Sequence, residues 1–190
     1  MLKRAKPNGG LAMTTISPKV AIGAVLAALL GGCVDSATPL MTGAQPVLGP
    51  DVKVHLYVLR GSSASGPDIG TYHWDGQEYR AVNKAPFEVV SFTAIPLAGN
   101  DLIIQSRSAR PQINGIEYAI ARKIAPSTYI VSAIDEEDAD GTTRAKFCSI
   151  GGSDTCRTDS QEGLLALARA TAAKSELKGS LAVLVADDKP

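Results

Sequence analysis

The sequence predicts a mostly β chain of the α+β class, with one amphipathic helix near the C-terminus. Short runs rich in valine, isoleucine, threonine and tyrosine follow one another, separated by Gly, Pro, Asn and Asp residues that favour turns. Only residues 159–178 repeat apolar side chains at helical spacing. Because the turns are short, we expect neighbouring strands to be antiparallel, in a meander that forms a curled sheet, a sandwich or a half-barrel.

The first strands are predicted within residues 52–82. Residues 52–59 place valine or leucine at alternate positions, as in a strand with one buried face. Residues 70–74 and 78–82 flank Asp75-Gly76-Gln77, and Asp-Gly between aromatic and β-branched residues favours a tight hairpin.

Further strands are predicted along the middle of the chain. They cover residues 87–97, 102–106, 116–124 and 128–134. Residues 98–101 and 125–127, which contain Gly99 and Pro126, would join these strands in pairs.

The helix is predicted to start at Asp159 as the N-cap, with Glu162 three residues later as in a capping box. Late lysines at positions 174 and 178 suit the negative end of the helix dipole. Residues 180–186 are apolar and predict a final buried strand. A helix that returns to such a strand would cover one face of the sheet.

The N-terminus has the layout of a secretory signal. A basic stretch without acidic residues leads to an apolar run at residues 20–30, which is about half the roughly 20 residues that a membrane-spanning helix needs. The sequence Leu30-Gly31-Gly32-Cys33 ends this run and resembles the lipobox of bacterial lipoproteins. The alternatives are an ordinary signal peptide with an incidental cysteine, or a misannotated start, and Met13 is a second candidate start.

The resemblance implies cleavage before Cys33, a lipid on its thiol and an acylated (palmitate-type) amino end. Several acyl chains give stable anchoring where one would be marginal. In the sorting rule of such lipoproteins, Asp directly after the cysteine favours the inner membrane. Here Val34 holds that position and Asp35 the next, which favours the outer membrane, with the domain facing the periplasm.

Three parts of the chain follow from this resemblance. Residues 1–32 would be the signal peptide, residues 33–51 a lipidated flexible tether rich in Pro and Gly, and residues 52–190 a single β-rich domain. Residues 1–32 contain four basic and no acidic residues, so the mature chain keeps 15 basic and 19 acidic residues, a net charge of −4. A mildly acidic surface argues against nucleic acid as a partner.

Cys148 and Cys156 remain as an even pair, with seven residues between them in a Gly- and Ser-rich stretch. In an oxidising compartment this pair predicts a disulfide. Zinc would need two further ligands, and the only histidines, His55 and His73, lie far upstream without ligand spacing. A redox-active pair would normally have the CxxC spacing.

Patterns for catalysis are weak. The serines of residues 61–66 lack the G-x-S-x-G spacing of a nucleophile elbow, and His55 and His73 are the only candidate histidine bases. Residues 135–141 faintly resemble a calcium loop, but the position of the bidentate carboxylate falls on Phe147. The alternative for this acidic run is a solvated connecting loop. We therefore expect no catalytic residue, metal or cofactor.

The aromatic residues Tyr72, Trp74 and Tyr79 are the candidate ligand-binding patch, for a sugar or a peptide. The alternative is that they are cross-strand packing of a small β domain. We expect a membrane-anchored envelope lipoprotein that is a non-enzymatic binding, interaction or structural module. Its partners would be the bilayer, through acylated Cys33, and an envelope protein or glycan. The alternative function is a periplasmic enzyme that acts on glycan or peptidoglycan.

Overall fold

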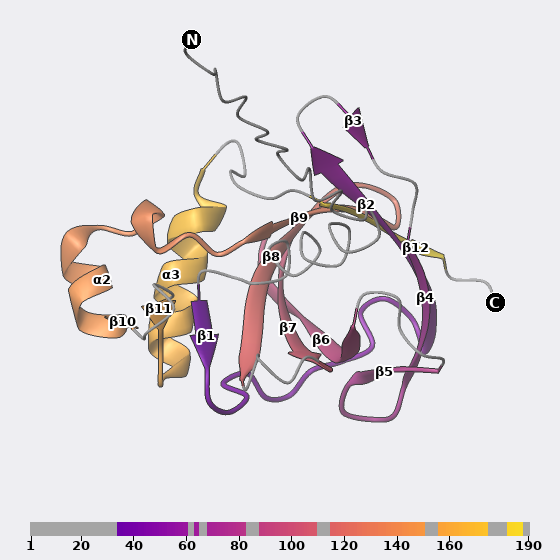
Figure 1. Cartoon of the computed structure of the whole chain (residues 1–190), viewed down its shortest axis with the longest axis horizontal. Helices are drawn as coiled ribbons and strands as arrows, with labels where there is room; N and C mark the ends of the chain where they lie inside the picture. Colours follow the sequence, from indigo (N-terminus) through magenta and orange to yellow (C-terminus); the bar gives the residue numbers. More distant parts are fainter. Residues whose placement is uncertain are drawn as a thin grey trace, which may run out of the picture.

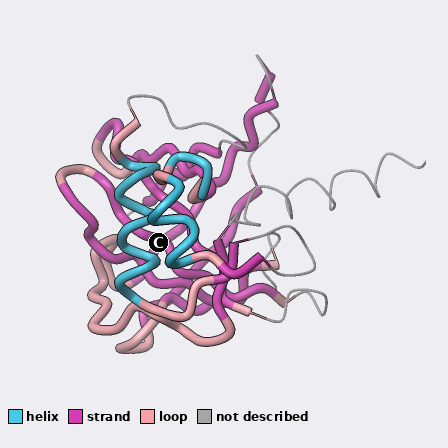
Figure 2. Tube along the Cα trace, turned by 90° about the vertical axis from the view of Figure 1, so that its left-hand side faces the viewer, coloured by secondary structure: helices cyan, strands magenta, loops and turns pink. Residues whose placement is uncertain are grey.

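The computed structural model describes residues 34–60, 63–64, 68–82, 88–109, 115–150, 156–174 and 182–187. Within these residues the chain is mostly β, with two α-helices on one side of the sheet (Figures 1 and 2). The strands are β1 (Val34–Ser36), β2 (Asp51–Arg60), β3 (Ser63–Ala64), β4 (Asp68–Trp74), β5 (Tyr79–Ala81), β6 (Val89–Ala98), β7 (Asp101–Ser108), β8 (Ile116–Ala125), β9 (Thr128–Ala133), β10 (Ser149–Ile150), β11 (Cys156–Arg157) and β12 (Ala182–Asp187). The helices are the 3-10 turn η1 (Glu136–Asp138), α2 (Gly141–Phe147) and α3 (Gln161–Ala172). The predictions of a mostly β chain and of a C-terminal helix are confirmed.

The strands from β4 to β9 each pair antiparallel with the next strand along the chain. The sheet then curls, because β12 pairs with β9 on one side and with β2 on the other, and β2 pairs with β4. As a whole the sheet is mixed, because one pair of its strands is parallel. The strand β1 joins β8 and pairs parallel with β11, and the path of paired strands ends at β10.

The parallel pair β1–β11 departs from the expected antiparallel sheet. Its two partners are short and lie 122 residues apart, so neither the hydrophobic alternation nor a turn signal marks it. The ion pair between Arg157 and Asp35, with Nε 2.8 Å from Oδ1, lies across this pair.

Two clusters of buried side chains make up the core. One lies on the inner face of the curl: Leu48, Val52, Val54, Tyr72, Tyr79, Val89, Phe92, Ala94, Ile104, Ala119, Ala121, Tyr129 and Val131. The other joins the opposite face of the sheet to α3, which lies beside β8 in Figure 1: Val34, Met41, Ile95, Ile103, Ile116, Tyr118, Ile120, Ile134, Ala139, Cys156, Leu164, Leu167 and Ala168. Alternate residues of β6, β7 and β8 therefore face different clusters, as a strand buried on both sides requires.

The acidic run at residues 135–141 forms helix caps. The Asp135 carboxylate accepts a hydrogen bond from the backbone N–H of Glu137, at the start of η1. Asp140 accepts from the backbone N–H groups of Thr142 and Thr143, at the start of α2. We did not predict α2 from the sequence, because its seven residues are too few to show helical periodicity.

Cys148 is the C-cap of α2 and forms the predicted disulfide with Cys156 in β11, with 4.9 Å between their Cα atoms. This prediction is confirmed. The disulfide joins α2, which packs against α3, to the short antiparallel pair β10–β11.

The N-cap of α3 is Ser160, one residue after the predicted Asp159, and its side chain accepts from the backbone N–H of Gly163. Serine and aspartate are equally good caps, so the sequence did not decide between these neighbours. At the other end, Arg122 of β8 donates to the carbonyl oxygens of Ala172 and Lys174. A strand residue thus satisfies carbonyl oxygens at this end of the helix. Lys178, one of the two late lysines of the predicted helix, lies outside the described residues.

Residues 34–50, which we expected to belong to a flexible tether, lie against the domain. The side chains of Val34, Met41 and Leu48 are buried, and Val34 is fully buried within β1. The segment contains only a few apolar residues among Pro and Gly, and its fixed position depends on side-chain hydrogen bonds described below. The signal segment and Cys33 lie outside the described residues, among which no helix is long and apolar enough to cross a membrane.

Gly163 of α3 lies against Phe147 of α2, so a substitution at Gly163 tests the packing of the two helices. A Cβ on Gly163 would lie 2.5 Å from Thr158 Oγ1 and 2.8 Å from Phe147 Cδ1, so Gly163→Ala forces buried groups apart. We expect a loss of about 1–3 kcal/mol in the free energy of unfolding, measured by denaturant titration. The matched control is Gly141→Ala, where a Cβ meets no atom within 4 Å. Equal free energies of unfolding for the two variants would contradict the close packing of α2 against α3 at Gly163.

Candidate ligand-binding cleft

The aromatic residues singled out in the sequence lie in the core. Tyr72 and Tyr79 are 1% and 0% exposed, and Trp74 is partly buried. Phe92 joins them, with its ring 5.0 Å from that of Tyr72 and 4.9 Å from that of Tyr79. Burial raises the pKa of both tyrosines above its ordinary value. Tyr72 and Tyr79 therefore form cross-strand packing and do not present a surface to a ligand, whereas Trp74 packs against them and keeps part of its surface exposed.

The two histidines lie on different parts of the surface of β2 and β4. His73 Nδ1 is 2.6 Å from Asp51 Oδ1, and both side chains are more than half exposed. His55 is partly buried in β2. The serines Ser62 and Ser65 lie outside the described residues. Among the residues that the structure does describe, no three His, Cys, Asp or Glu side chains gather where they could hold a metal ion.

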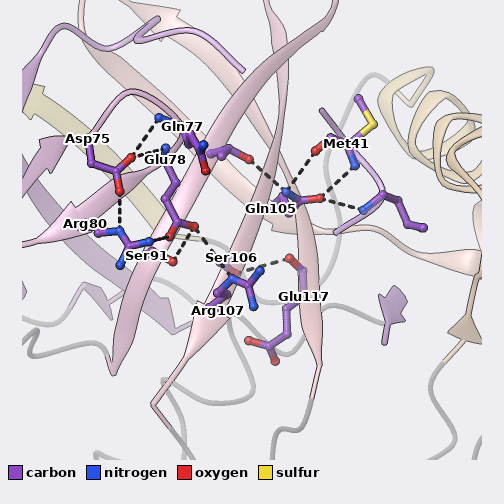
Figure 3. A network of polar contacts seen from close by, with 12 residues as sticks. Met41, Asp75, Gln77, Glu78, Arg80, Ser91, Gln105, Ser106, Arg107 and Glu117 are labelled. Carbon is purple, nitrogen blue, oxygen red and sulfur yellow. Dashed lines mark hydrogen bonds and ion pairs between the residues drawn. The ribbon is translucent and has the colours of Figure 1, made fainter. Parts of the chain in front are cut away.

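A concave site lies elsewhere, on the face of the sheet at β5, β6 and β7. It is an open cleft of about 920 Å³ between residues 39–44 on one side and residues 76–81 on the other. Its polar side chains form the network shown in Figure 3. We refer to it below as the cleft.

Side chains from three neighbouring strands form the floor of the cleft. Arg80 of β5 pairs with Ser91 of β6, and Ser91 pairs with Arg107 of β7. One step along the sheet, Thr93 of β6 lies opposite Gln105 of β7. Because the side chains of a strand alternate, these five residues share one face, the face opposite to the Tyr72 cluster.

The turn between β4 and β5 forms one wall. The Asp75 carboxylate accepts from the backbone N–H groups of Glu78 and Gln77, each at 2.9 Å, and from Arg80 Nε. The backbone hydrogen bonds from Glu78 and Gln77, followed by the contact with Arg80, lower the pKa of Asp75. Gly76 has φ +102°, a conformation that glycine adopts without strain, as the predicted Asp-Gly hairpin requires.

The other wall is residues 39–44, which buried side chains hold in place. Gln105 Oε1 accepts from the backbone N–H groups of Leu40 and Met41, at 3.1 and 3.0 Å, and its Nε2 donates to the Met41 carbonyl oxygen. The Tyr118 hydroxyl also accepts from Leu40 N–H. Since the Ser36 hydroxyl donates to Thr38 O, the Tyr118 hydroxyl donates to Ser36 Oγ, 2.8 Å away.

Charge in the cleft centres on Glu78, whose side chain is 19% exposed. It accepts from Ser91 Oγ at 2.9 Å and pairs with Arg80 Nη2 at 2.8 Å. Arg107 Nε is 3.9 Å from the same carboxylate, which is beyond hydrogen-bond distance. Arg80 is thus held by two carboxylates, whereas the guanidinium of Arg107 makes no hydrogen bond to any of the described residues.

The cleft was not predicted from the sequence. Its polar residues alternate with buried residues along ordinary strands, and the contact between Gln105 and Met41 spans 64 residues. The one available signal was the presence of Gln105 and Thr93 at positions where a strand buried on both faces should be apolar.

Comparisons of the chain with protein-family models, with curated proteins and with solved structures gave no match. The geometry and the sequence together are therefore the basis for the function proposed below.

The wall at residues 39–44 should depend on Gln105. In Gln105→Ala the Met41 N–H loses its acceptor, and we expect its hydrogen exchange to accelerate by roughly ten- to a hundredfold, from about 1–3 kcal/mol of lost stabilisation. The Leu48 N–H should be unaffected, because it donates to the Tyr79 hydroxyl. The matched control is Gln77→Ala, which removes an exposed amide. Unchanged exchange at Met41 would show that other contacts hold this wall.

Proposed function

We propose that the protein is a lipid-anchored lipoprotein of the cell envelope that acts as a non-enzymatic binding module. The signal layout and the Leu30-Gly31-Gly32-Cys33 sequence support the anchor, and Val34 after the cysteine favours the outer membrane, with the domain in the periplasm. In this proposal the curled β4–β9 meander is a half-barrel scaffold whose outer face carries the binding site.

The observation that carries the binding role is the cleft of about 920 Å³. Its volume lies in the usual range for small-molecule sites, and its walls are fixed from opposite directions by Asp75 and Gln105. A site whose walls are already ordered loses little entropy when it binds a ligand. The inner face of the curl, by contrast, is occupied by the Tyr72 cluster.

The chemistry of the acidic groups supports binding over glycan hydrolysis. Glycosidases need one carboxyl group that stays protonated as a general acid. The hydrogen bonds to Asp75 lower its pKa and so favour the ionised form. Glu78, the acid that lines the cleft, accepts from Ser91 and pairs with Arg80, so its carboxylate is already bonded to groups of the protein.

Removal of the proposed lipid site tests the anchor. In Cys33→Ser no thioether can form, so we expect the signal segment to stay uncleaved and the protein to lose its lipid-dependent membrane association. Incorporation of radiolabelled palmitate reports on the lipid itself. Measured beside membrane fractionation, it separates lipid attachment from retention at the membrane by an uncleaved signal segment. Incorporation of palmitate into the variant would refute lipidation at this residue. The control is Cys156→Ser, which removes a disulfide partner and leaves the lipobox intact.

Photocrosslinking in the native cell tests the cleft as the binding surface. A photoreactive amino acid at Gln77, which is exposed on the wall of the cleft, should give a discrete adduct that mass spectrometry identifies. The same group at Lys123, exposed near the end of β8 and not among the residues that line the cleft, is the control. Identical adducts at both positions would rule out the cleft as the specific site.

A further inference from the structure

We propose that the cleft binds a sugar that carries a carboxylate, and that Arg107 is the residue that binds the carboxylate. This inference rests on the proposed binding role of the cleft and adds the chemical class of the ligand.

Arg107 is the positive group with free donors. Its side chain is 49% exposed, and within the described residues its guanidinium makes no hydrogen bond, with Glu78 Oε2 3.9 Å from Nε. Arg80 differs, because Asp75 binds its Nε and Glu78 its Nη2. A ligand therefore reaches the Arg107 donors without breaking an existing hydrogen bond, and a planar guanidinium can bind a carboxylate through two parallel hydrogen bonds.

The charge of the lining favours a ligand with one negative charge. Arg80, Arg107 and Glu78 are the charged residues that line the cleft, and their formal charges leave one positive charge. A phosphate group carries about −1.5 to −2 at neutral pH and would meet stronger repulsion from Glu78, which lies beside Arg107. A carboxylate neutralises Arg107 with less repulsion.

The rest of the lining suits a sugar ring. Gln77 offers an exposed amide that can exchange hydrogen bonds with sugar hydroxyls. Ser91 and Thr93 are polar residues of the floor, but they are almost fully buried, and their hydroxyls already bond to Glu78 and Gln105. Ala81 and Val90 also line the cleft and provide apolar surface for the C–H face of a ring. Small ligands bind in sites of this kind, where a few convergent polar groups fix the orientation of the ligand.

Calorimetric titration of the full chain in detergent tests the proposal with glucuronic acid, glucose and acetate as probes. We expect glucuronic acid to bind at least about tenfold more tightly than either glucose or acetate, because only this probe has both the ring and the carboxylate. Arg107→Gln should reduce the affinity for glucuronic acid about tenfold or more and bring it close to that for glucose. Arg107→Lys keeps the charge but not the two parallel donors. Its affinity for glucuronic acid should lie between those of the unchanged protein and of Arg107→Gln.

The control is Lys123→Gln, which removes one positive charge from the exposed end of β8, and it should bind glucuronic acid as the unchanged protein does. Equal binding of glucose and glucuronic acid, or equal weakening by Lys123→Gln and Arg107→Gln, would overturn the proposal. Absence of glucuronic acid binding alongside a Gln77-specific crosslink would overturn the carboxylated-sugar class and leave the cleft as a binding site. The midpoint temperature of thermal unfolding should be the same for Arg107→Gln and for the unchanged protein. This result would show that the loss of binding does not come from a loss of folding.

Discussion

The structure depends on three buried side chains that satisfy the backbone of residues 36–49. This segment makes few strand hydrogen bonds, yet it covers the sheet, and a buried backbone N–H without an acceptor is costly. Tyr118 and Gln105 provide hydrogen bonds at residues 36–41, and the Tyr79 hydroxyl accepts from Leu48 N–H and donates to Gly49 O. With those groups satisfied, Met41 and Leu48 pack into the two core clusters.

The same hydrogen bonds shape the cleft. Gln105 belongs to the floor, and through the backbone of Leu40 and Met41 it also fixes one wall. Asp75 fixes the opposite wall through two backbone N–H groups that do not involve the floor. Because each wall has its own support, the shape of the space above Arg107 does not depend on a ligand. The proposed binding would therefore cost little conformational entropy.

Local patterns predicted much of this fold. Asp75-Gly76 predicted the hairpin, and Trp74 pairs with Tyr79 across it. Cys148 and Cys156 were close enough in sequence to predict their bond. The rest depends on contacts between distant residues: Ser36 and Tyr118 lie 82 residues apart, and neither residue type signals that contact. The cleft was missed for that reason. Tyr72, Trp74 and Tyr79 were candidates for a ligand-binding patch because aromatic residues suit both packing and binding.

If Cys33 is lipidated as proposed, the complete burial of Val34 in β1 limits how far the domain can move from the lipid. An acyl chain on Cys33 would be separated from the sheet by a single peptide bond, since the strand begins at the next residue. Such a protein would have no flexible linker between the lipid and the domain. The domain would stay at the membrane surface, and a ligand or partner would have to come within about one domain diameter of the membrane to bind it.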